Sequence, residues 1–150
     1  DHLDLHSFPT RRSSDLATWA IEGLKPPRTI NNFILLGSSI SSDYDMTEAM
    51  KRIGGKVYVY CSPHDEILNG AVRVLGTIDG KFGVDSAGLV GLRPPRPDPR
   101  IVNIPWSEKY EVYGWTGAHT DCTSQAFVEN ILIAHVTTHP LAVSRLDTPD

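Results

Sequence analysis

The chain has few of the features that assign a protein to a specialised class. Its two cysteines are too few for a disulfide scaffold and leave the redox compartment open. No apolar run approaches the ~20 residues that a membrane helix needs, so no membrane span is predicted. Basic residues are not in excess, since 14 Lys and Arg against 18 Asp and Glu give a net charge of −4. This balance argues against broad electrostatic binding to nucleic acid or anionic lipid.

What is present is the composition of a globular domain. The 150 residues, 40% hydrophobic and 21% charged, fit one domain or part of a larger one. The 11 prolines and 12 glycines predict many turns and short helices. The chain begins at Asp1 rather than Met, and we expect that its true start, with any signal peptide, is missing. The compartment is therefore left unassigned, with the cytoplasm as the first choice, and the oligomeric state stays open.

The first sixteen residues, DHLDLHSFPTRRSSDL, show neither a helical nor a strand period and offer no apolar face for packing. They also lack the apolar core of a secretory signal. The string FPTRRSSDL resembles the conceptual translation of a sequencing adapter. We therefore expect residues 1–16 to be an artefactual or disordered tail, the alternative being a natural polar tail, and residues 17–150 to be the C-terminal part of one domain.

Three short apolar segments predict buried strands, and helical patterns lie between them. The expected strands are Asn32–Gly37, Lys56–Cys61 and Arg100–Pro105. The expected helices are the end of one at Ala17–Leu24, a second at Met46–Arg52 with Asp45 and Glu48 as a box-like cap, and a final helix capped by Ser124. This alternation predicts an α/β fold, a three-layer sandwich with a mostly parallel sheet.

The rest of the chain is expected to be less regular. Glu66–Leu75 is predicted as a short helix interrupted at Gly70, and Gly76–Pro99 as a long irregular cover. On the final helix one apolar stripe is formed by Phe127, Ile131, Leu132, His135 and Val136.

Two side chains with acid–base chemistry follow the predicted strands. Asp65 lies four residues after Cys61, and His119 lies in a glycine-containing loop between the third strand and the final helix. Loops at the carboxyl ends of parallel strands gather at one edge of a sheet, so we expect these residues to meet. A carboxylate that accepts the imidazole Nδ1–H would fix the tautomer of the ring and stabilise the imidazolium formed on proton transfer.

The order strand, S-x-x-D turn, long connection, strand and G-x-H before a final helix resembles the C-terminal half of an α/β-hydrolase. The segments LGSS (36–39), DYD (43–45), AM (49–50) and VYVYCSPHD (57–65) are similar to those of a group of uncharacterised bacterial hydrolase-like proteins. The likeness spans about residues 17–136. It implies a Ser-His-Asp triad in which Asp65 is the acid and His119 the base, acting on a small-molecule or acyl substrate without a cofactor.

The nucleophile that this resemblance implies is not found. The sequence contains no G-x-S-x-G pattern, and Ser13 and Ser14 lack flanking glycines and a preceding apolar strand. We therefore expect a fragment of a serine-type α/β-hydrolase, cleaving ester or other acyl bonds in its parent, that lacks the nucleophile and is inactive by itself. The alternatives are a non-catalytic binding or scaffold module of the same fold and an unrelated flavodoxin-like domain.

Other residues support weaker alternatives. His64, beside Asp65, would form a 2-His-carboxylate metal set with His119 and Asp121, but no HxH or HExxH spacing supports it, so no metal is expected. Cys61 and Cys122 are expected as free buried thiols, paired only if the protein is exported. An aromatic cluster, Trp106, Tyr110, Tyr113 and Trp115, either lines an acyl pocket or covers the edge of the sheet.

Overall fold

The structure is a computed structural model that describes residues 12–136, with side chains from Asp15 onward. Its longer elements are the helix α1 (Arg12–Glu22) and the strands β1 (Phe33–Leu36), β2 (Val57–Cys61) and β3 (Ile101–Pro105). The short α-helices are α2 (Thr47–Met50), α3 (Arg73–Leu75), α4 (Ala87–Val90), α5 (Gln125–Phe127) and α6 (Ile133–Val136). Turns of π geometry are η1 (Leu68–Val72) and η4 (Val128–Leu132), and 3₁₀ turns are η2 (Glu108–Tyr113) and η3 (Asp121–Thr123).

The three strands form one parallel sheet in the order β1-β2-β3. Leu35 lies opposite Val59, which lies opposite Asn103 on the other side. The predicted α/β class with a parallel sheet is confirmed, because each of the three apolar segments forms a strand where it was expected.

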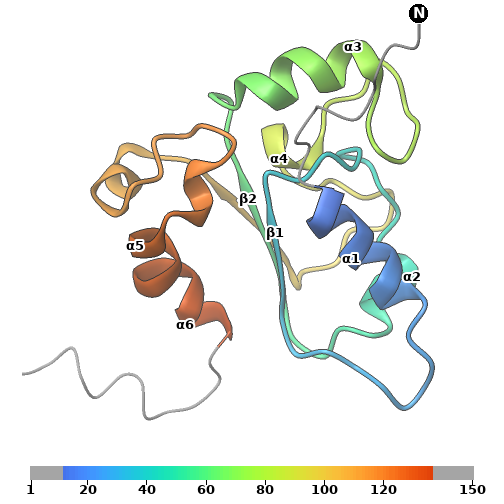
Figure 1. The fold of residues 1–150 in the computed structure, drawn as a ribbon. Coiled ribbons are helices and arrows are strands. Elements are labelled where there is room, and N and C mark those ends of the chain that lie inside the picture. The colour runs from blue at the N-terminus through green and yellow to red at the C-terminus, as the bar shows by residue number, and fades with distance from the viewer. Residues whose placement is uncertain (1–11, 137–150) are drawn as a thin grey trace, which may run out of the picture.

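Successive strand residues point to opposite sides of the sheet, so each strand presents side chains to both faces. Helices cover both of these faces. Leu35 and Val59 pack in a core cluster with the residues of α2, on the side where α1 and α2 lie. Tyr58 and Tyr60 point the other way, into a second cluster with Phe127 of α5. Figure 1 shows α1 and α2 on one side of the strands, α5 and α6 on the other, and α3 across the end where β2 finishes. Among the described helices, none is long and apolar enough to cross a membrane.

Two predicted elements differ from those observed. The helix predicted at Met46–Arg52 is shorter in the structure, where it is α2. Asp45 accepts a hydrogen bond from Thr47 N at 3.0 Å, as a capping residue would. Glu48 forms an ion pair with Lys51 instead of closing the predicted capping box. The irregular cover at Gly76–Pro99 contains the helix α4, whose Ala87 is fully buried beneath the loops. Helix α4 consists of four small or apolar residues that pack on β2. A run of four residues is too short to show a helical period in the sequence.

The two ends of the described chain also differ from expectation. Helix α1 begins at Arg12, so the expected boundary after Leu16 falls inside it. Asp15 is fully buried and accepts hydrogen bonds from Ser38 Oγ (2.6 Å) and Ser39 Oγ (2.5 Å), so the expectation that this segment has nothing to pack against is wrong for that residue. Residues 1–11 lie outside the described part, and the adapter resemblance stays a prediction. On the final helix Val136 is 63% exposed, so this member of the expected stripe does not pack against the sheet, whereas His135 stacks on Tyr58 of β2.

Candidate functional site

Asp65 and His119, the predicted acid and base, are in contact at the carboxyl edge of the sheet. His119 Nδ1 lies 2.7 Å from Asp65 Oδ2, and the two side chains are only 3% and 2% exposed. The contact joins residues 54 positions apart. It arises because β2 and β3 are parallel neighbours, so the segments that follow them leave the sheet at the same edge.

The carboxylate of Asp65 is held at both of its oxygens. Oδ2 accepts from the imidazole, and Oδ1 accepts from Leu68 N at 2.9 Å. The second bond is an N-cap interaction, since Asp65 stands where the turn after β2 becomes the helical segment that includes η1. The carboxylate therefore cannot rotate toward or away from His119 without breaking a hydrogen bond to the backbone.

The loop that carries His119 passes very close to the turn that carries Asp65. Gly117 has φ +98°, and a Cβ there would lie 2.9 Å from Ser62 Oγ and 3.0 Å from His64 Cβ. Only glycine permits both this backbone conformation and this close approach. The main-chain oxygen of His119 accepts a hydrogen bond from the thiol of Cys122, at 3.6 Å, which ties the loop to η3.

This geometry assigns the protons of the imidazole. A carboxylate only accepts, so Nδ1 carries a hydrogen, and Nε2 of the neutral ring presents its lone pair. Nε2 is buried, and no donor or acceptor among the described residues bonds to it. The pair can therefore take up a proton at Nε2 while Asp65 stabilises the imidazolium that forms.

A small cavity adjoins the imidazole. Its volume is about 10 Å³, enough for about one water molecule and far below the pockets of several hundred Å³ that hold small-molecule ligands. The residues that line it are Gly37, Tyr60, Ser62, Asp65, Gly88, Trp115, Gly117, Ala118, His119 and Cys122. Gly37 and Gly88 were not singled out from the sequence; the signal available for Gly37 was its place directly after a buried strand at this same edge.

No hydroxyl or thiol in the described part of the chain stands as a nucleophile on Nε2. Ser62 lines the cavity, but its Oγ accepts a hydrogen bond from His64 N at 3.1 Å. Burial raises the pKa of the Cys61 thiol to about 11, which keeps it protonated and unreactive at neutral pH. The side chains of Ser13 and Ser14 lie outside the described residues.

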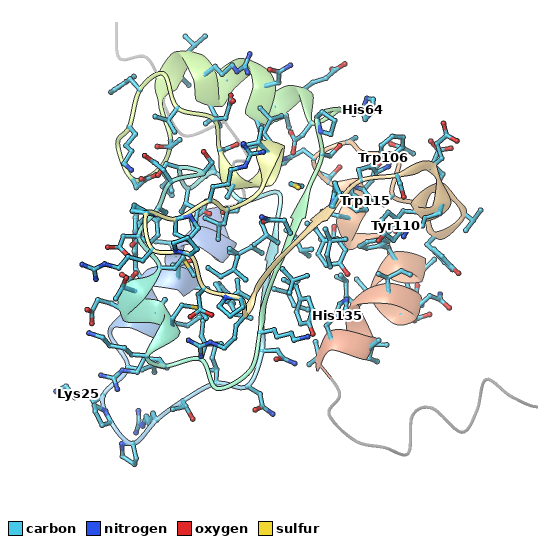
Figure 2. All side chains as sticks on the ribbon, turned by 180° about the vertical axis from the view of Figure 1, so that it is seen from behind. Lys25, His64, Trp106, Tyr110, Trp115 and His135 are labelled. Atoms are coloured by element: carbon cyan, nitrogen blue, oxygen red, sulfur yellow. The ribbon has the colours of Figure 1, made fainter. Side chains whose placement is uncertain are left out.

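The metal alternative gains no support from the geometry. Within residues 15–136, no three His, Cys, Asp or Glu side chains are placed to hold an ion together. His64 is exposed and lies edge-on to Trp106, with ring centroids 4.5 Å apart (Figure 2). Asp121 accepts instead from Thr116 Oγ1.

The aromatic cluster belongs to the core on the second face of the sheet. Tyr110 and Trp115 are buried, and they pack with Tyr60 and Phe127 at centroid distances of 5.0–5.6 Å. Figure 2 shows Trp106, Tyr110 and Trp115 gathered beside the strands. The cluster packs on a face of the sheet rather than covering its edge, and of its four members only Trp115 also lines the cavity beside His119.

Comparison of the chain with protein-family models, with curated proteins and with solved structures finds no match.

Proposed function

We propose that this chain carries the acid and the base of a serine-type α/β-hydrolase that cleaves an ester or similar acyl bond. One observation supports the proposal above all others: the buried 2.7 Å contact between His119 Nδ1 and Asp65 Oδ2. A buried imidazole with one nitrogen bonded to a carboxylate and the other unpartnered among the described residues is the arrangement that general-base activation of a hydroxyl requires.

In the proposed reaction His119 moves protons in both directions. Nε2 takes the proton from a serine Oγ as that oxygen bonds to the acyl carbon, and Asp65 stabilises the imidazolium. The same proton then passes to the leaving alkoxide as the ester C–O bond breaks. Water releases the acyl group by the same two transfers, with the serine oxygen as the leaving group. No cofactor takes part in these steps.

The serine belongs, in this proposal, to a segment of a longer parent protein. The DNA upstream of the Ala17 codon tests this statement. A reading frame that encodes a glycine-flanked serine after an apolar strand supports it. An upstream frame without such a serine favours the second candidate, a non-catalytic binding or scaffold module.

The functional test compares variants of the longer chain on short p-nitrophenyl esters. His119→Ala is expected to lower kcat/KM by about 10⁴-fold or more, because it removes the general base of the triad. His64→Ala is the control, since this imidazole is exposed, lies one residue before Asp65 and packs edge-on against Trp106. Equal activity of wild type and His119→Ala would refute the hydrolase proposal.

The second candidate function rests on the cavity. A space of about 10 Å³ beside His119 offers no room for a substrate within the described residues. A binding module of the same fold would keep the Asp65–His119 contact as a structural link between two loops. In that case the longer chain would hydrolyse none of the esters, and His119→Ala would lower only its stability.

A further inference from the structure

Gly37 occupies a position at which β1 meets the imidazole of His119. It follows Leu36, the last residue of β1, and is buried. Its φ of +52° lies in the left-handed region that side chains rarely adopt. The chain turns here from the strand into the segment 38–41 at the carboxyl edge of the sheet.

The imidazole stands where a side chain of residue 37 would be. A Cβ on Gly37 would lie 3.2 Å from both Cε1 and Nδ1 of His119, and 3.4 Å from its carbonyl oxygen. These distances are tighter than ordinary van der Waals contacts between carbon and ring atoms. Nδ1 is the atom that donates to Asp65, so the crowding would fall on the hydrogen bond of the pair itself.

The backbone of Gly37 has no room to retreat from the ring. Helix α4 also approaches Gly37 closely, since a Cβ on Gly88 would come within 2.7 Å of the carbonyl carbon of Gly37. Gly88 N also donates to Ser38 O at 2.8 Å, which fixes the spacing between α4 and this turn. We therefore expect an added Cβ at residue 37 to be accommodated by a shift of the imidazole.

Asp65 cannot follow the ring if it moves. Its Oδ1 is bonded to Leu68 N, which holds the carboxylate at the start of the helical segment after β2. A displacement of a few tenths of an ångström would therefore lengthen the 2.7 Å bond, and short charge-assisted hydrogen bonds weaken steeply with length.

We infer that Gly37 is a positioning residue: the absence of a side chain at the end of β1 sets the orientation of His119 against Asp65. This inference deepens the proposed function and rests on it, because the orientation of the imidazole affects the reaction only if His119 acts as the general base. The alternative is that glycine serves here only to make the turn. The two differ in what a methyl group at residue 37 does to the Nδ1 proton.

The experiment is ¹H–¹⁵N NMR of the histidine rings in the full 150-residue chain, without substrate. The hydrogen-bonded Nδ1 proton of His119 should resonate well downfield of the amides, and its absence in His119→Gln assigns it. In Gly37→Ala we expect this signal to move upfield or vanish. Gly83→Ala is the control, since Gly83 also has a positive φ (+73°) but its Cβ would have nothing within 4 Å.

A Gly37→Ala variant that folds and keeps the downfield signal unchanged would overturn the inference. If that variant does not fold, Gly37→Asn takes its place, because asparagine tolerates the left-handed conformation and still carries a Cβ; an unchanged signal there would overturn it equally. The measurement is independent of ester hydrolysis. An inactive longer chain whose Nδ1 signal responds to Gly37→Ala would refute the proposed function and leave the positioning role standing.

Discussion

Replacing Asp65 separates two roles of its carboxylate, the hydrogen bond to His119 and the cap of the helical segment that follows. The side chain is 2% exposed and accepts one hydrogen bond from His119 Nδ1 and one from Leu68 N. Asp65→Ala removes both acceptors. Asp65→Asn keeps an oxygen for Leu68 N but presents an amide NH₂ to the imidazole.

The two variants should differ in stability by an amount that these contacts set. Loss of an N-cap costs about 1 kcal/mol, and loss of a buried hydrogen bond to a charged group costs about 1.5–3 kcal/mol. Asp65→Ala should therefore lower the free energy of unfolding by about 2.5–4 kcal/mol. Asp65→Asn keeps the cap and can donate to Nδ1 once the ring changes tautomer, so its cost should be about 1–2 kcal/mol, mainly the lost charge assistance.

Urea unfolding followed by circular dichroism measures these costs, and ¹⁵N shifts of the imidazole report the tautomer. We expect Nδ1–H in wild type and Nε2–H in Asp65→Asn, which would leave no lone pair at Nε2 to act as a base. Asp45→Ala is the matched control for capping, because Asp45 is exposed and accepts from Thr47 N at 3.0 Å. Equal costs for Asp65→Ala and Asp65→Asn, or an Nδ1–H tautomer in Asp65→Asn, would refute this account of the site.

Two further predictions concern buried groups outside the pair. Cys61 and Cys122 should resist iodoacetamide in the native protein at pH 7 and react once it is unfolded in urea, because both are buried and burial raises the pKa of Cys61 to about 11; fast native labelling, read by mass spectrometry, would contradict this. Burial also lowers the pKa of His135, which stacks on Tyr58 at 3.9 Å, below its ordinary 6.5. The unfolded chain then binds a proton that the folded chain refuses, so stability should fall as the pH drops through and below 6.5; an unchanged slope in His135→Gln would show that another group is responsible.

The sequence predicted the strands well because each is a short apolar or β-branched run that only a covered sheet can bury. It predicted the meeting of Asp65 and His119 for a topological reason, since both follow parallel strands at the same edge. These inferences need only the period of the side chains and the direction of the strands.

What the sequence did not predict depends on close contacts. Helix α4 has four residues, and Gly88 looks like a helix breaker until the approach of Ser38 shows why nothing larger fits. The start of α1 was missed because Asp15 is buried by two serines far along the chain rather than by an apolar face. The proposed role of Gly37 likewise depends on its close contact with the ring of His119, 82 positions away, which no local sequence pattern indicates.

The cap that Asp65 provides bears on how substitutions in related chains should be interpreted. Under the proposed function, a related chain that has lost hydrolysis would still lose folding stability if this aspartate were replaced, so selection would preserve the aspartate for reasons unrelated to chemistry. The imidazole makes one hydrogen bond among the described residues, to Asp65, and it does not cap a helix. Under the proposed function, retention of the histidine is therefore a better indicator of activity than retention of the aspartate, which also caps a helical segment.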